Sequence, residues 1–152
     1  MKLLLAALAI VSVVSCSKNS KVSEKAVPDA VKTTFALLYP VATVAEWDKD
    51  DDLTYEAKFK KEGREISVIF SVDGKVRKTE EEMNTTALPS AIVNHVNINY
   101  NNATIENAEK ITDAYNIVTY EVEIKNKDLY FDANGSFIKE VTGSGKDKED
   151  SD

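Results

Sequence analysis

Two stretches of the chain carry apolar residues at the three- and four-residue spacing of an amphipathic helix. The first set is Val27, Val31, Phe35 and Leu38, and the second is Leu88, Ile92, Val96 and Tyr100. Because residues at this spacing share one side of a helix, each stretch is expected to bury one face. Pro28 and Pro89 stand at the first turn, where a missing backbone N–H leaves no helical hydrogen bond unmade. The pattern predicts two helices that begin at prolines.

Alternating apolar and polar residues follow each predicted helix and indicate β-strands. The apolar positions of these strands are Tyr55, Ala57, Phe59, Ile66, Val68, Phe70 and Val72 in the first half, and Tyr120, Val122, Ile124, Leu129 and Phe131 in the second. Asp73-Gly74 and Asn134-Gly135 suit hairpin turns, because these residues tolerate positive φ. Residues 44–47 and 105–111 are also predicted as strands, although the spacing of apolar residues in 105–111 would suit a short helix.

The same apolar, proline and glycine positions occur twice, 61 residues apart. The matching pairs are Val27/Leu88, Pro28/Pro89, Val31/Ile92, Phe35/Val96, Tyr39/Tyr100, Ala42/Ala103, Val44/Ile105, Phe70/Phe131 and Gly74/Gly135. The segment 55–57 matches 120–122 at an offset of 65, and a shorter turn in the second copy removes the difference. We interpret this as a tandem duplication of a helix followed by an antiparallel β-meander. The predicted class is α+β, with helices packed on one sheet face; the two sheets either join or lie side by side.

A proline-led helix ending at Tyr39-Pro40, a Tyr-Glu strand start at Tyr55 and Tyr120, and hairpins at Gly74 and Gly135, all in tandem, resemble the PepSY-like family. This family is also described as similar to β-lactamase inhibitor protein. The resemblance implies two helix-and-sheet units and a non-catalytic periplasmic or cell-surface role. In β-lactamase inhibitor protein the open sheet surface grips the target enzyme. No residue motif carries that specificity over, and a chain with one cysteine cannot form the disulfides typical of that inhibitor.

The N-terminus has the pattern of a secretory signal: Lys2, an apolar run over residues 3–11, and a small residue before Cys16. The run is too short for a membrane-spanning helix, which needs about 20 apolar residues. Residues 13–15 resemble a bacterial lipobox, so Cys16 is predicted to be lipidated and to tie the chain to a membrane. The predicted organisation is a signal peptide at 1–15, a tether at 16–25, repeats at 26–84 and 85–142, and a disordered acidic tail at 143–152.

The charge of the chain bears on its partners. The formal net charge is −7, and removal of residues 1–15 takes away one lysine and no acid. An acidic protein is a poor match for nucleic acid, whose binding depends on phosphate neutralisation by Lys and Arg. An acidic cluster directly after the lipidated cysteine would resemble the surface-export signal of Bacteroidetes-type lipoproteins, and Ser17-Lys18-Asn19-Ser20 lacks one. We therefore predict a cell-envelope protein on the outer membrane facing the periplasm.

Candidate chemistry along the chain is sparse. His95 is the single histidine and has no cysteine or nucleophile motif beside it, so neither a zinc site nor a catalytic triad is indicated. The acidic run 48–52 lacks the glycine and glutamate that an EF-hand loop requires, and it is interpreted as a solvated turn. The chain is therefore not expected to be an enzyme, and no cofactor or metal is predicted.

The charged face of the predicted sheet is the one feature with a candidate function. It is expected to display Glu56, Lys58, Ile69, Glu121, Glu123 and Tyr130. Exposed aromatic and charged side chains on a rigid sheet can anchor a protein or peptide partner. The leading hypothesis is a lipid-anchored envelope protein that binds such a partner through this face. The alternative is a carrier of a small apolar ligand between helix and sheet, in a cavity lined by Phe35, Trp47, Phe59 and Phe70.

Overall fold

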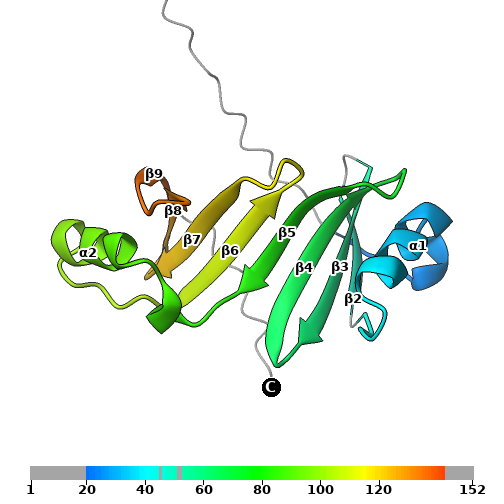
Figure 1. Ribbon diagram of the computed structural model, residues 1–152, viewed down its shortest axis with the longest axis horizontal. Helices are drawn as coiled ribbons and strands as arrows, with labels where there is room; N and C mark the ends of the chain where they lie inside the picture. The colour runs from blue at the N-terminus through cyan, green and yellow to red at the C-terminus, as the bar shows by residue number, and fades with distance from the viewer. Residues whose placement is uncertain (1–19, 45, 51–52, 143–152) are drawn as a thin grey trace, which may run out of the picture.

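The computed structural model describes residues 20–44, 46–50 and 53–142. These residues form an α+β fold in which nine strands make one antiparallel sheet, with neighbours in chain order throughout (Figure 1). The strands are β1 (Ser20–Lys21), β2 (Glu46–Asp50), β3 (Thr54–Lys61), β4 (Arg64–Ser71), β5 (Val76–Glu82), β6 (Asn107–Asp113), β7 (Val118–Ile124), β8 (Lys127–Asp132) and β9 (Phe137–Thr142). The helices are η1 (Glu24–Ala26), α1 (Asp29–Leu38), η2 (Thr85–Ala87) and α2 (Ser90–Asn99).

The two halves of the chain share a single sheet. Strand β5 pairs with β6 over five residues, from Lys78 opposite Asp113 to Glu82 opposite Glu109. This pairing settles the open choice between joined and separate sheets. It also places the last strand of the first half directly beside the first strand of the second half, in the middle of the molecule (Figure 1).

Helix α1 follows Pro28, which occupies the N-cap position. Its buried residues Val31 and Phe35 belong to one cluster with apolar residues of β2, β3 and β4. Aromatic rings dominate this cluster: the centroid of Phe35 lies 5.6 Å from that of Trp47 and 5.2 Å from that of Phe59. Leu38 was expected on the buried face but is 52% exposed. The helix ends there, and Tyr39 leaves the helical conformation with φ −131°. The Tyr39 ring, 4.7 Å from that of Phe59, packs on the cluster while Leu38 stays exposed.

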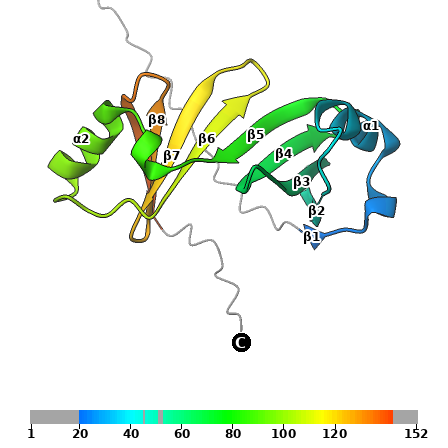
Figure 2. The same ribbon diagram turned by 60° about the horizontal axis from the view of Figure 1, so that its bottom comes forward.

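Helix α2 has a cluster of its own, formed with β6, β7 and β8. Ile92 and Val96 are fully buried in it, together with Val122, Leu129 and Phe131. The two helices lie at opposite ends of the sheet (Figures 1 and 2).

Strand register places both clusters on the same face of the sheet. Val68 of the first cluster lies opposite Thr79, which lies opposite Thr112. Thr112 is four residues from Ala108 of the second cluster, and residues an even number apart on a strand share a face. The other face, here called the open face, carries the alternate residues of β2 to β9. The buried residues of α1 and α2 pack in the two clusters, on the opposite face.

The predicted hairpin turns are confirmed. Gly74 and Gly135 have φ values of +80° and +81°, and their N–H groups donate to Ser71 and Asp132 across the turn. The β4–β5 turn also touches α1: a Cβ added to Gly74 would lie 2.5 Å from the carbonyl oxygen of Ala30. Glycine at this position therefore serves both the turn and the close approach of helix and sheet.

The structure differs from the sequence-based boundaries in three places. Ser20–Lys21 pairs with β2 as β1, so the end of the predicted tether at 16–25 is part of the sheet. The strands predicted at 44–47 and 105–111 exist but begin at Glu46 and Asn107. Asp48 of the acidic run lies within β2 and is 3% exposed, so it is not part of a solvated turn.

No helix among the described residues has the length and apolar character needed to cross a membrane. The predicted signal peptide at 1–15, Cys16 and the predicted tail at 143–152 lie outside the described residues.

Candidate binding face on the open side of the sheet

The six residues predicted for partner binding all lie on the open face, in two groups. Glu56 and Lys58 of β3 stand beside Ile69 of β4, with Glu56 directly opposite Ile69. The second group is made of Glu121 and Glu123 of β7 and Tyr130 of β8, with Glu121 directly opposite Tyr130. Strands β5 and β6 separate the two groups. All six side chains are half-buried, because a pleated sheet with long neighbours shields them from solvent.

The first group is organised around an ammonium group. Lys58 Nζ lies 2.8 Å from Asp48 Oδ2 and 3.7 Å from Glu56 Oε2. The hydroxyl of Ser67 donates a hydrogen bond to Glu56. Burial alone would lower the pKa of Lys58, but the hydrogen bond to Asp48 and the charges of Glu56, Asp48 and Glu46 raise it. Lys58 therefore stays charged and neutralises the carboxylates around it.

The second group is organised around a phenol among carboxylates. Burial raises the pKa of Tyr130, and so do the charge of Glu121, the hydrogen bond to it, and the charges of Asp128 and Glu80. Lys139 Nζ lies 4.6 Å from the centre of the Tyr130 ring, within the range of a cation–π contact. Tyr130 is therefore held in its neutral form, with its ring covered on one side by a cation.

A hollow of about 150 Å³ opens within the second group. Glu109, Glu121, Glu123, Asp128 and Tyr130 contribute to its lining. Asp128 is only 6% exposed. Four carboxylates thus line one small depression, which is a concentrated negative site on the surface.

A row of glutamates crosses the middle of the open face. Glu65 lies at the edge of the row, and its backbone N–H donates to Glu82 Oε2. Glu82 lies directly opposite Glu109, and Glu109 directly opposite Glu121. Like charges directly opposite each other across strands destabilise a sheet. The row is therefore a feature that sheet stability alone disfavours.

Sequence reasoning missed Asp48, Glu82, Glu109 and Asp128 as members of this face. Asp48 was missed because the acidic run was interpreted as a solvated turn. Glu109 was missed because residues 105–111 suited either a strand or a short helix. Once the strands are fixed, alternation places both residues on the charged side. The pairing of β5 with β6, which brings Glu82 beside Glu109, has no local signal.

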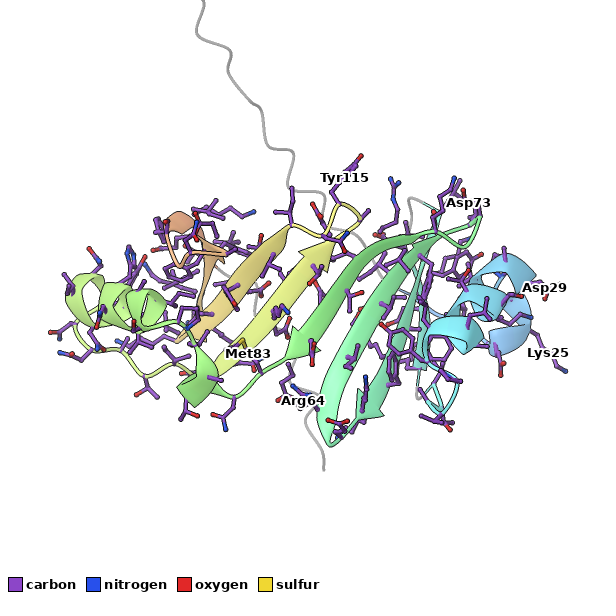
Figure 3. The ribbon with its side chains drawn as sticks, in the orientation of Figure 1. Lys25, Asp29, Arg64, Asp73, Met83 and Tyr115 are labelled. Carbon is purple, nitrogen blue, oxygen red and sulfur yellow. The ribbon has the colours of Figure 1, made fainter. Side chains whose placement is uncertain are left out.

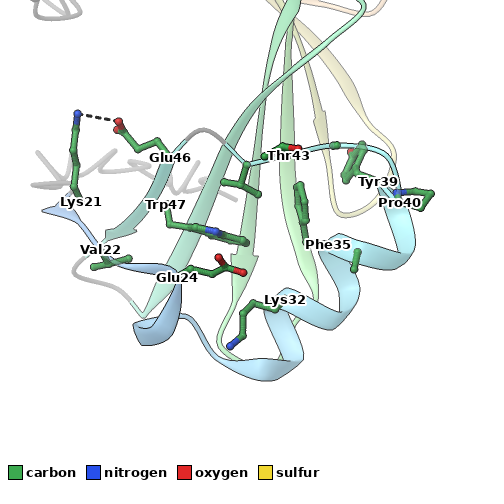
Figure 4. Close-up of a pocket in the computed structure, with 13 residues that line it drawn as sticks. Lys21, Val22, Glu24, Lys32, Phe35, Tyr39, Pro40, Thr43, Glu46 and Trp47 are labelled. Carbon is green, nitrogen blue, oxygen red and sulfur yellow. Dashed lines mark ion pairs between the residues drawn. The ribbon is translucent and has the colours of Figure 1, made fainter.

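Of the four residues predicted to line an apolar ligand cavity, two are packed inside the core and two line an open hollow. Phe59 and Phe70 are 1% and 0% exposed and pack within the first cluster. Phe35 and Trp47 contribute to a hollow of about 740 Å³ between α1, the loop after it and β2 (Figure 4). Charged side chains border this hollow, including Lys21 and Glu46, whose ion pair spans 2.9 Å (Figure 4).

Among the described residues, no group of His, Cys, Asp and Glu side chains has an arrangement that could hold a metal ion. His95 instead packs on aromatic rings: it stacks on Phe137 at 4.7 Å and meets the edge of Phe131 at 5.3 Å.

The chain matches a known protein family twice along its length. A family model described as "Putative beta-lactamase-inhibitor-like, PepSY-like" matches residues 12–78 and again residues 67–139. The chain belongs to the PepSY-like family. The resemblance predicted from the sequence is therefore confirmed. No curated protein matches the chain.

Solved structures of Bacteroides proteins share the fold. A BLIP-like protein from Bacteroides fragilis NCTC 9343 is 26% identical with a TM-score of 0.62, over 80% of this chain and 90% of that one. A DUF2874 family protein from Bacteroides ovatus ATCC 8483 is 26% identical with a TM-score of 0.64, over 76% and 86%. A structure from Bacteroides eggerthii DSM 20697, titled "putative periplasmic proteins", is 21% identical with a TM-score of 0.65, over 76% and 88%.

Proposed function

We propose that this PepSY-like protein is a non-catalytic, lipid-anchored envelope protein that binds another protein or a peptide through its open face. The observation that carries the proposal is the open face itself. It spans both halves of one continuous sheet and combines half-buried carboxylates, Lys58, Ile69 and Tyr130. Aromatic and charged residues on such a platform favour recognition of a partner, because little conformational entropy is lost on binding.

The proposed location rests on the N-terminus and on the relatives. A short apolar run before Cys16 fits export followed by lipidation, which would join the chain to a membrane. One structural relative, from Bacteroides eggerthii DSM 20697, is named as a periplasmic protein. We place the protein on the outer membrane, facing the periplasm.

The internal repetition supports an origin by tandem duplication. The family model matches the chain twice, and a 3₁₀ turn, a helix and four strands occur in the same order from η1 to β5 and from η2 to β9. A duplicated sheet offers a partner a surface twice as wide as one repeat would.

A capture experiment tests the function. The mature chain, residues 16–152 with Cys16→Ser, is immobilised and exposed to detergent-solubilised envelope. The same chain carrying Glu121→Lys and Tyr130→Ala should lose the captured protein, because both changes fall on the open face. The matched control carries Glu106→Lys and Tyr115→Ala and should keep it. Tyr115 is 84% exposed at the β6–β7 turn, away from the face (Figure 3).

A photo-crosslinking amino acid then maps the contact. Placed at Thr119 or Ile69 on the open face, it should crosslink to the captured protein; placed at Leu37, exposed on α1, it should not. Equal capture by all variants, or crosslinking only from Leu37, would place the contact elsewhere and refute the proposal.

The second candidate function is carriage of a small apolar ligand. The hollow beside Phe35 and Trp47 favours it, and the tight packing of Phe59 and Phe70 limits how deep a ligand could reach. Native mass spectrometry of protein purified from its host tests this function. A co-purified small molecule that Trp47→Ala removes would favour the carrier, and protein of unliganded mass would count against it.

A further inference from the structure

One end of the sheet carries exposed apolar side chains at its turns. They are between 43% and 84% exposed and are here called the apolar rim: Leu53, Val72, Tyr115 and Ile117. Leu53 and Val72 flank the directly opposed pair Thr54 and Ser71, so both lie at the same end of β3 and β4. Tyr115 and Ile117 belong to the turn between β6 and β7. Figure 3 shows Tyr115 at the same end of the sheet as Asp73 of the β4–β5 turn.

The hairpin turns at the opposite end of the sheet are different. The β3–β4 turn is made of Glu62-Gly63 and the β7–β8 turn of Lys125-Asn126, so neither contains an apolar side chain. Single exposed apolar residues are ordinary on a protein surface and need no explanation. Here four of them gather at one end, while the hairpin turns of the other end are polar. The two ends therefore suit contact with different surroundings.

The β6–β7 turn holds its two rim residues in place. Asp113 Oδ1 accepts hydrogen bonds from the backbone N–H groups of Tyr115, at 2.8 Å, and Ile117, at 2.9 Å. Asn116 between them has φ +62°, a conformation that asparagine tolerates better than most residues. Because the turn is already ordered by its own hydrogen bonds, little conformational entropy is lost when its side chains meet a surface.

Strand β1 brings the start of the chain to the same end of the sheet. It is antiparallel to β2, with Ser20 opposite Lys49 and Lys21 opposite Asp48. Since β2 runs towards Leu53, Ser20 is the end of β1 nearer to the apolar rim. Cys16 precedes Ser20 by four residues, which span at most about 14 Å. A lipid on Cys16 would therefore hold this end of the sheet close to a bilayer.

We propose that the apolar rim lies on the surface of the lipid bilayer that anchors the chain, with the strands directed away from the membrane. This inference rests on the lipid anchor of the proposed function and adds the protein surface that meets the lipid. Tyrosine suits the interfacial layer, because its ring is apolar and its hydroxyl polar. A lipid at Cys16 and the rim would act as two membrane signals at one end of the molecule. The open face then stays accessible to a partner.

The charge of this end selects the kind of lipid. Asp73 and Asp113 lie at its turns, and Asp50 to Asp52 precede Leu53 in the sequence. The ammonium of Lys75 lies 2.7 Å from Asp73 and neutralises that carboxylate. The end as a whole is acidic, so an anionic lipid surface would repel it. The surface that fits is zwitterionic, and its attraction for the rim is hydrophobic.

The test couples the mature chain, residues 16–152, through its single cysteine, Cys16, to a maleimide lipid in a phosphatidylcholine nanodisc. A second lipid carries gadolinium on its headgroup, so the NMR signals of ¹⁵N-labelled amides near the bilayer are broadened. We expect broadening at residues 72–75 and 113–117 and intact signals at 62–64 and 125–127. The β6–β7 turn is decisive, because β6 lies five strands from β1, about 24 Å at the usual strand spacing. The tether by itself does not bring that turn to the bilayer.

The test variant carries Tyr115→Ser and Ile117→Ser. It should lower the ratio of docked to undocked chain about tenfold and so restore the signals of residues 113–117. The matched control carries Leu37→Ser and Ile98→Ser, which remove two equally exposed apolar side chains from α1 and α2 and should leave the broadening unchanged. The same NMR spectra report whether each variant is folded, and Tyr115→Ser alone serves if the double change unfolds the turn. Replacing part of the phosphatidylcholine by phosphatidylglycerol should weaken the broadening at 113–117.

Several results would overturn the inference. They are broadening confined to β1 and β2, equal broadening at both ends of the sheet, or broadening at 113–117 that the double serine variant leaves intact. Broadening that increases with phosphatidylglycerol would also overturn it, because the contact would then be electrostatic. The capture experiment uses Cys16→Ser in detergent, without a bilayer. A protein captured there while the rim stays unbroadened would leave partner binding standing and refute only the membrane contact. Broadening of the rim without any captured protein would do the reverse.

Discussion

The contact between the β4–β5 turn and α1 gives a sharp test of how helix and sheet fit together. Gly74 has φ +80°, and a Cβ placed on it would lie 2.5 Å from the carbonyl oxygen and 2.8 Å from the carbonyl carbon of Ala30, and 3.0 Å from Thr34 Oγ1. Gly63 has nearly the same φ, +82°, but a Cβ there would meet nothing within 4 Å. The two glycines therefore separate backbone strain from steric clash.

Both Gly→Ala changes impose a left-handed conformation on alanine, which costs about 1 kcal/mol. Gly63→Ala should lower the free energy of unfolding by that amount alone. Gly74→Ala must in addition push the turn or α1 away, and overpacking of this kind costs about 2 kcal/mol. The expected loss is about 3 kcal/mol for Gly74→Ala. The two variants should differ in unfolding temperature by roughly 4–8 °C for a chain of this size.

Urea unfolding of both variants measures the difference. Trp47 is the single tryptophan and is buried in the first cluster, so its fluorescence reports on the region where the change acts. Equal losses for the two variants would refute the reasoning, because they would mean that the turn has room beside α1.

Three further predictions follow from the described contacts. Lys58→Met leaves the buried carboxylate of Asp48 without its ammonium and should lower the free energy of unfolding, measured in urea, by about 2 kcal/mol. If high salt lowers the stability of the unmodified protein by the same amount, the ion pair is screened by solvent and the prediction is wrong. Phe131→Ala empties a fully buried site of the second cluster and should cost about 4 kcal/mol by the same assay, whereas a loss under about 1 kcal/mol would contradict the packing. Burial and the nearby Glu140 raise the pKa of Tyr100 to about 12, so stability present below pH 10 should fall as pH rises towards 12. Absorbance at 295 nm should show late-titrating phenols, and Tyr100→Phe should reduce this late step while Tyr130, whose pKa is also raised, remains. A titration with every phenol near pH 10 would contradict the prediction.

Local signals in the sequence predicted the elements well. Proline-led apolar stripes located both helices, and the glycines of the two hairpins fixed the turns, since each signal depends only on neighbouring residues. The prediction of a buried Leu38 was wrong: Leu38 is the last residue of α1 and is 52% exposed, and Tyr39, one residue later, contacts Phe35 and Phe59. A periodic pattern does not reveal where the backbone leaves the helix.

Non-local pairing accounts for what the sequence left open. The union of the two halves depends on β5 finding β6, and either strand could have remained an edge. The same union creates the glutamate row, so the most unusual feature of the open face became visible only in the fold. The exchange of Lys58 for Glu123 was present in the sequence at the offset of 65. The strand pairing was needed to show that Lys58 and Glu123 each lie beside a pair of opposed carboxylates.

The two halves of the open face argue against a purely structural origin for its charge. Both have the same strands, the same register and the same opposed carboxylates, so the demands of the sheet on them are alike. One half meets those demands with Lys58, and the other adds Glu123 and Asp128 to a site that is already negative. Selection for stability alone would favour the first solution twice, because the second adds further carboxylates beside an existing pair in a half-buried setting. Proteins accept such local costs where a surface has to meet something else.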